Sequence, residues 1–221
     1  MTAAPLVALA AALGLGSAPR ELPQPEDPAA IVKPATGADK RKVADLRRSL
    51  KRLEAKLRPG SKGTLLLARA GGPMQGDPTR IVRVRAVTAP AWPEDLLVAY
   101  VILLDGRGRT RGVREEPVSQ SGDWYIADTW LFDEAGRTVA VRRHRAGIGE
   151  GCDEPAKEDW TAFWDGDRLI ARDYAKDPPD RCQLMLAPLE VDATIALYLE
   201  RRGLVAEAME RGADASPAPA P

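Results

Sequence analysis

The chain carries a single histidine, His144, and this restricts the chemistry that its side chains can perform. One histidine and two cysteines cannot supply the four ligands of a structural zinc site or a histidine-based metal centre. A Ser-His-Asp triad would need His144, but no serine lies in a Gly-x-Ser-x-Gly turn and three arginines surround His144. Nearby positive charge lowers the pKa of an imidazole and makes it a poor base partner. We therefore expect His144 to be a surface strand residue, and we assign no catalytic residue, metal ion or cofactor.

Carboxylates are the second group of side chains that could do chemistry. A glycosidase needs two carboxyl groups that face each other across a cleft. The sequence does not show such a pairing, and acidic residues at turns and edge strands also keep a sheet soluble. A glycan-acting hydrolase therefore stays open as an alternative. Its candidate residues are Glu115, Glu116, Asp123, Asp128, Asp153, Glu154, Glu158 and Asp159.

Four of the five tryptophans fall into two pairs that share strand parity. Trp124 and Trp130 are an even number of positions apart, and so are Trp160 and Trp164. In a strand, each pair would lie on one face. A band of indoles inside the protein is core, whereas an exposed band is a platform for sugar rings, lipid or an apolar peptide. Tryptophan is usually well buried, which favours core, and the four residues are kept as candidate ligand-binding residues.

The segments that must position these side chains repeat one pattern three times. Each copy has an apolar run, a turn opened by aspartate, and a second run that carries arginines. Aspartate at the first position of a turn accepts a hydrogen bond from a backbone N–H ahead of it, and glycine is favoured at the fourth position. The pattern predicts three β-hairpins within an antiparallel meander. The copies are residues 101–114, 129–142 and 161–172, with their turns at Asp105, Asp133 and Asp165.

Residues Phe132–Arg137 resemble the tyrosine-aspartate repeats of large bacterial shell proteins. The resemblance covers six residues, and the copies at Asp105 and Asp165 depart from it in the aromatic residue or the glycine. It implies shared hairpin chemistry, and no family is assigned from it.

Helical periodicity precedes the strands. Apolar residues recur at steps of three and four, which predicts an amphipathic helix over residues 39–57 with Asp39 as its N-cap. Residues 39–58 contain nine basic and three acidic residues. Two roles stay open: a helix that lays its leucines on the sheet, or a basic helix that docks on an anionic surface or partner. The apolar positions are Val43, Leu46, Leu50, Leu53 and Leu57.

A second helix is expected over residues 189–211, with Gly203 as a cap. The predicted fold class is α+β: an antiparallel meander of about seven or eight strands over residues 63–175, with the basic N-terminal helix and the C-terminal helix packed on one face. Residues 39–212 form one domain, preceded by a proline-rich linker over 19–38 and followed by a disordered tail over 213–221.

The first 18 residues predict export. Residues 3–16 form an apolar stretch of signal-peptide length, followed by small residues. The two cysteines, Cys152 and Cys182, lie almost symmetrically about the third turn at Gly166. An antiparallel pair brings such positions together, so we expect a disulfide between them. Both features predict a periplasmic or secreted location.

The function predicted first is a non-enzymatic binding or structural module outside the cytoplasm. Its partner would be an envelope component or a small apolar or sugar ligand, and the formal net charge of zero argues against nucleic acid. Two alternatives stay open, namely the glycan-acting hydrolase and an interaction protein that docks through the basic helix 39–57. The sequence does not define an oligomeric state.

Overall fold

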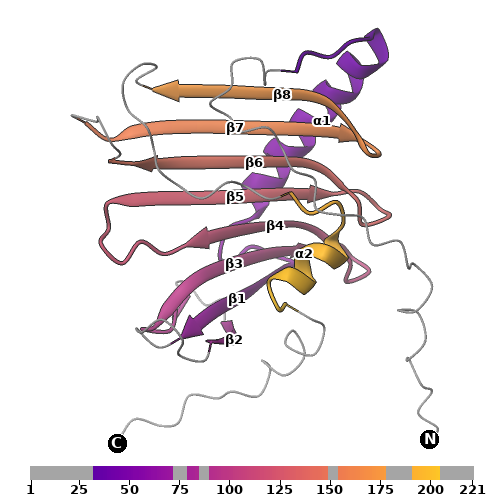
Figure 1. Cartoon of the computed structure of the whole chain (residues 1–221). Coiled ribbons are helices and arrows are strands. Elements are labelled where there is room, and N and C mark those ends of the chain that lie inside the picture. The colour runs from indigo at the N-terminus through magenta and orange to yellow at the C-terminus, as the bar shows by residue number, and fades with distance from the viewer. Residues whose placement is uncertain (1–31, 72–78, 85–89, 149–153, 178–190, 205–221) are drawn as a thin grey trace, which may run out of the picture.

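A computed structural model of the chain describes residues 32–71, 79–84, 90–148, 154–177 and 191–204. These residues form one eight-stranded antiparallel sheet and two helices (Figure 1), which confirms the α+β class. The expected signal segment 1–18, the tail 213–221, Cys152 and Cys182 lie outside the described residues. The elements are α1 (Gly37–Lys56), β1 (Thr64–Gly71), β2 (Thr79–Val84), β3 (Leu96–Leu104), β4 (Thr110–Pro117), β5 (Trp124–Phe132), β6 (Thr138–Gly147), β7 (Ala156–Asp165), β8 (Arg168–Asp177) and α2 (Ile195–Arg201).

The three hairpins predicted from aspartates are confirmed. At the β3–β4 turn, Oδ1 of Asp105 accepts hydrogen bonds from the backbone N–H groups of Arg107 (2.9 Å) and Arg109 (3.0 Å). Gly108 adopts φ 75° there, a conformation that suits glycine. Asp133 repeats these bonds at the β5–β6 turn. The aspartates therefore reverse the chain by satisfying backbone donors that the turn leaves without strand partners.

The third turn is tighter, and its aspartate has a different role. Asp165 pairs with Arg168 across the β7–β8 turn. Its carboxylate forms an ion pair with Lys42 of α1. The third hairpin is thereby linked to the helix as well as closed on itself.

The strand order is β2-β1-β3-β4-β5-β6-β7-β8, so β1 lies between β2 and β3. This departs from a simple meander at one end of the sheet. Both faces of β1 are apolar and buried: Leu65 and Leu67 pack on one side, Leu66 and Ala68 on the other. A strand with two apolar faces belongs inside a sheet. The edge strand is β2, in which Thr79, Arg80 and Arg83 are exposed.

One row of side chains crosses the sheet beneath α1 and alternates in size. The register places a large residue on each odd-numbered strand from β3 to β7 and a small residue on each even-numbered one. The small residues leave space for the helix, because a Cβ atom on Gly112 would lie 2.5 Å from Cδ2 of Leu53 in α1. The row is Leu103, Gly112, Leu131, Ala140, Phe163 and Ala171.

Helix α1 starts at Gly37 with Thr36 as its N-cap, and the expectation that Asp39 is the N-cap is wrong. Asp39 is instead the third helical residue of a capping box, where its carboxylate accepts from the N–H of Thr36 (3.2 Å). Arg168 of β8 donates to the same carboxylate at 2.7 Å. This hydrogen bond and those with Thr36 lower the pKa of Asp39 to about 2, against the opposing effect of burial. The start of the helix is thus anchored to the third hairpin.

The two helices cover opposite faces of the sheet, so the expectation that they share one face is wrong (Figure 1). Val43, Leu50 and Leu53 of α1 pack with the row described above. Tyr198 of α2 packs on the other face against Trp130, with 4.8 Å between the ring centroids. The physical reason is that neighbouring residues of these strands are apolar on both faces, and each face needs a cover.

Within the described residues 191–204, helix α2 begins at Ile195 and ends at Arg201, so the expected helix does not extend over residues 191–194. The side chain of Thr194 accepts a hydrogen bond from the N–H of Leu197 (3.3 Å) and fixes the start of the helix at Ile195. The expected cap at Gly203 is confirmed: this residue has φ 63°, and the N–H of Leu204 reaches back to the carbonyl of Leu199 (2.8 Å). Residues 189–190 and 205–211 lie outside the described part.

The close approach of α1 to Gly112 gives a test of the packing. We expect Gly112→Ala to lower the free energy of unfolding by about 1–3 kcal/mol, because the new methyl group would meet Leu53 and the carbonyl of Trp130 (2.9 Å). Gly106→Ala is the matched control, since a Cβ there has open space. Urea unfolding of the two variants measures the difference, and equal stabilities would contradict this account of the helix position.

Candidate functional site

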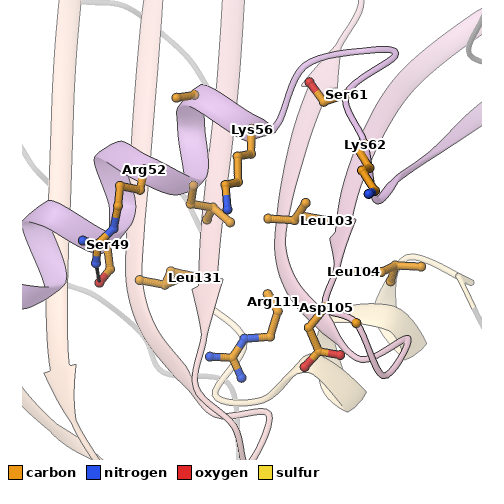
Figure 2. A pocket seen from close by; sticks show the side chains of 13 residues that line it. Ser49, Arg52, Lys56, Ser61, Lys62, Leu103, Leu104, Asp105, Arg111 and Leu131 are labelled. Atoms are coloured by element: carbon orange, nitrogen blue, oxygen red, sulfur yellow. Dashed lines mark hydrogen bonds between the residues drawn. The ribbon is translucent and has the colours of Figure 1, made fainter.

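A groove of about 710 Å³ lies between the second half of α1 and the β3–β4 hairpin (Figure 2). Its floor is apolar and its walls are basic. The helix forms one wall, the segment that follows the helix forms the end, and the hairpin forms the opposite wall. The lining residues are Ser49, Arg52, Leu53, Ala55, Lys56, Ser61, Lys62, Leu103, Leu104, Asp105, Gly106, Arg111 and Leu131.

Four cationic side chains line this groove, and none of them is neutralised by a carboxylate within the described residues. They are Arg52, Lys56, Lys62 and Arg111. Arg52 donates to the hydroxyl of Ser49 at 3.1 Å, which leaves its charge uncompensated. Arg52, Lys56 and Lys62 are exposed to solvent, and Arg111 is half-buried. Four of them around one recess create a local positive potential that attracts anions.

Most other arginines in the described strands form ion pairs with carboxylates, which distinguishes the groove from them. Arg143 of β6 contacts Asp128 at 2.6 Å, and Arg202, which follows α2, contacts Glu115 at 2.5 Å. The acid in the groove, Asp105, is also paired. Nε of Arg109 donates a hydrogen bond to its carboxylate at 2.9 Å. Several interactions lower the pKa of Asp105, and the backbone hydrogen bond from Arg109 has the largest effect.

The elements that carry the cations are held in place by backbone hydrogen bonds. Arg52 and Lys56 are four residues apart on α1 and therefore lie on one side of the helix. Lys62 lies on the segment between α1 and β1. There the carbonyl of Ser61 accepts from the N–H and the hydroxyl of Thr64, at 3.1 and 2.6 Å. The carbonyl of Gly63 accepts from the N–H of Leu104 at 2.9 Å, which joins this segment to the hairpin.

Arg111 reaches the groove because β4 contains a β-bulge. Leu103 pairs with Gly112 and Leu104 pairs with Thr110, so Arg111 is the extra residue between them. An extra residue in one strand bends the strand and redirects its side chain. This places Arg111 on the α1 side of the sheet, where it lines the groove.

The same bulge occurs in the other two hairpins, but with apolar residues. The register shifts leave Val139 as the extra residue in β6 and Ile170 as the extra residue in β8. Both pack into the apolar layer beneath α1, and Ile170 is only 1% exposed. Arg111 therefore occupies a position that serves packing in two of the three hairpins and carries a charge in the third.

The floor of the groove is the end of the alternating row. Leu131 and Leu53 are buried there, whereas Leu103 is half-buried and keeps part of its surface open. Leu104 is also part of the lining, but it packs with the hydrophobic cluster of the α2 face. Because α1 ends at Lys56, it covers the middle of the row and leaves this end free. The groove thus presents apolar surface below and positive charge around it.

A smaller groove of about 410 Å³ flanks α1 on its other side, over β6 to β8. Its cations are largely neutralised: Arg47 contacts Asp173 at 2.7 Å, and Arg142 contacts both Glu54 at 3.1 Å and Asp159 at 2.7 Å. The two flanks of one helix therefore differ in charge balance, which singles out the larger groove as the candidate site.

The structure places three of the four candidate tryptophans in the core on the α2 face. Trp130, Trp160 and Trp164 are 0%, 5% and 1% exposed, and only Trp124 is partly open. The buried indoles do not line either of the two grooves beside α1. Their role as ligand-binding residues stays a prediction that depends on Trp124.

His144 and the candidate carboxylates lie on the strands away from the groove. His144 is half-buried, with its Nδ1 atom 3.3 Å from Asp159. Hydrogen bonds from Ser121 and Ser119 lower the pKa of Asp123, which is the reverse of what a general acid needs. The other described candidates lie in ion pairs with arginines, apart from the exposed Glu154: these are Glu115, Glu116, Asp128, Glu158 and Asp159, while Asp153 lies outside the described residues.

Comparison with protein families, with curated proteins and with solved structures finds no match to this chain. In the ranges that the structure describes, no helix combines the length and the apolar character needed to cross a membrane. Within the same ranges, no three His, Cys, Asp or Glu side chains come together as a metal site. The candidate function therefore has to be argued from the groove itself.

Neither Arg111 nor the groove was predicted from the sequence. The signal was present in the threefold repeat, because Arg111 and Val139 both lie six positions after the turn aspartates, while Ile170 lies five positions after its own. When the three copies are aligned at their bulges, the charged Arg111 occupies the same position as the apolar Val139 and Ile170. The sequence predicted a basic helix over residues 39–57, but it did not identify Arg52 and Lys56 as the two helix residues that line the groove.

The bulge position gives a test of whether Arg111 is needed for folding. We expect Arg111→Val to change the free energy of unfolding by less than about 0.5 kcal/mol, because the side chain makes no ion pair within the described residues. The reciprocal variant Ile170→Arg should cost about 3 kcal/mol or more, since it buries an uncompensated charge. Chemical denaturation measures both, and a large loss in Arg111→Val would show that Arg111 serves folding.

Proposed function

We propose that this protein is a non-enzymatic binding module that takes an anionic ligand in the groove between α1 and the β3–β4 hairpin. The single observation that carries the proposal is the set of four cations around an apolar floor, without a neutralising carboxylate in the described residues. This proposal combines the binding module predicted from the sequence with the anionic partner predicted for the basic helix.

The electrostatics of the groove support an anionic ligand. Charges that repel one another cost free energy in the free protein, and an anion relieves that cost on binding. Arginine offers a planar set of donors to a carboxylate or phosphate, and lysine adds a mobile point charge. In Figure 2, Lys56 and Arg111 lie between Arg52 on one side and Lys62 on the other, so an acidic ligand in the recess meets donors from the helix and from the hairpin.

The proposal is tested with the fluorescent anion 8-anilinonaphthalene-1-sulfonate. We expect Lys56→Gln and Arg111→Gln each to weaken its binding by about tenfold, the effect of losing one charge-assisted hydrogen bond. Lys51→Gln is the matched control, because Lys51 lies on the same helix and lines the smaller groove. Fluorescence titration at low and high salt measures the affinities, which should fall as salt rises.

Equal effects of the groove variants and the Lys51→Gln control would contradict the proposal. Such a result would show that the positive charge of α1 acts as a whole, as in docking of the helix on an anionic surface. Binding that does not respond to any of the three substitutions would remove an anionic ligand from consideration altogether.

We also propose that the protein is exported and carries a disulfide between Cys152 and Cys182. The described register of β7 and β8 supports the pairing. Lys157 is opposite Asp177 in the last described pair. Cys152 precedes Lys157 by five positions, and Cys182 follows Asp177 by five. The cysteines are therefore equidistant from one register pair, and a disulfide that closes a loop of this length is worth about 3–4 kcal/mol.

Intact-mass measurement of the full chain, expressed in a secreting bacterium, tests both statements. We expect a mature N-terminus close to Ser17 and a mass two hydrogens below that of the reduced protein. The Cys152→Ser variant should lose the mass difference and unfold at a lower urea concentration. An uncut chain with two free thiols in the periplasm would contradict export and the disulfide together.

The glycan-acting hydrolase is the weaker alternative on this structure. It requires two carboxyl groups in one cleft, one of them with a raised pKa. The two grooves contain Asp105, Glu54, Asp159 and Asp173, each of which contacts an arginine. Each of these carboxylates is already held in an ion pair, which does not favour the hydrolase.

A further inference from the structure

We propose that the ligand of the groove is a free, single-chain amphiphile with an acidic head group, such as an alkyl phosphate or a fatty acid. This inference rests on the proposed function and adds the chemical class of the ligand. The four cations would bind the acidic head, and the leucines of the floor would contact the chain.

The head group is assigned from the charge of the walls. Arg111 comes from strand β4, whereas Lys56 and Lys62 come from the helix and the segment after it (Figure 2). An acid placed among them meets donors from three separate elements. Two guanidinium groups and two ammonium groups exceed the charge of the one acid in the lining, Asp105, which Arg109 already binds. A neutral or cationic head group would leave this excess charge uncompensated.

The hydrocarbon chain of the proposed ligand is assigned from the apolar residues of the groove floor. Leu103 is half-buried and retains open surface, and it lies beside the buried Leu131 of β5 and Leu53 of α1. The lining includes no aromatic residue. Sugar rings and nucleobases are usually held by stacking on aromatic side chains, so a sugar phosphate or nucleotide would lack its main apolar contact here. Branched aliphatic side chains suit a flexible hydrocarbon chain instead.

A free molecule fits the geometry better than a bilayer surface. The leucines lie at the bottom of a recess, and the cations stand around it on the helix and the hairpin. A flat membrane would meet the cations first and leave the floor uncovered. The groove volume, about 710 Å³, falls within the range of about 300–1,000 Å³ that is typical of small-molecule sites.

The experiment measures binding of butyl, octyl and dodecyl phosphate to the full chain by titration calorimetry, below the concentrations at which they form micelles. We expect affinity to rise with chain length, by up to about fourfold for each methylene group that becomes buried. Dodecyltrimethylammonium, with the same chain and the opposite charge, should not compete. Inorganic phosphate should bind far more weakly than dodecyl phosphate.

Two variants test the contacts of the hydrocarbon chain and of the acidic head group separately. Leu103→Gln should reduce the gain from butyl to dodecyl phosphate, whereas Val118→Gln, at an exposed apolar residue outside the groove, should leave it unchanged. Ala55→Glu adds a negative charge to an exposed part of the wall and keeps the leucines intact. It should weaken all three phosphates about equally, and it provides a test that does not depend on a substitution in the half-buried floor.

The outcomes distinguish this inference from the proposed function. Equal affinity for all three phosphates, with a loss in Lys56→Gln, would overturn the amphiphile and leave the anion-binding groove in place. Binding only to vesicles of anionic phospholipid, and not to the free phosphates, would overturn it in favour of a surface-docking helix. No binding of any anion that depends on the groove cations would overturn both statements.

Discussion

The structure depends on the close contact between α1 and the sheet, which the row of alternating large and small residues allows. Gly112, Ala140 and Ala171 stand where larger side chains would push the helix outward. The large residues between them fill the space at the sides of the helix, with Leu131 and Phe163 buried. Apolar burial then stabilises the contact by about 1.5–3 kcal/mol for each fully covered leucine of α1. Because the helix crosses the row at an angle and stops at Lys56, the row is covered in the middle and open at Leu103 (Figure 1).

The same contact explains why positive charge collects on one side of the helix. On the flank that faces β6 to β8, acidic residues of the sheet lie opposite the basic residues of α1, and the pair of Arg47 with Asp173 shows how the charges cancel. On the flank that faces β3 and β4, the sheet offers Arg111 in place of a free acid. Like charges on facing elements cost stability, so the arrangement is difficult to explain by folding alone. The anion-binding groove that we propose would account for it.

The local parts of this fold were predictable, and the long-range parts were not. Asp105 and Asp133 specify their turns through bonds to residues at most four positions ahead, and Asp165 pairs in register with Arg168 three positions ahead. The three hairpins could therefore be predicted from the sequence. The place of β1 inside the sheet and the opposite faces of α1 and α2 depend on contacts between distant segments, which no local pattern encodes. The candidate site falls between these cases. The sequence shows an arginine at 111 where the other two copies have Val139 and Ile170. Only the bulge in the structure shows that the Arg111 side chain lies on the α1 side of the sheet.

The start of α1 also lies against the last strand of the sheet. The carbonyl of Val32 accepts a hydrogen bond from the backbone N–H of Arg172 in β8 at 2.9 Å, four residues before the N-cap Thr36. β8 is the outermost strand at that end, and an open outer strand can recruit a strand from another molecule. The segment before α1 therefore covers part of the edge strand at which two copies of the protein could otherwise pair. A protein shortened to begin at the helix would lose this hydrogen bond, and β8 would then be free to pair with the same strand of a second molecule.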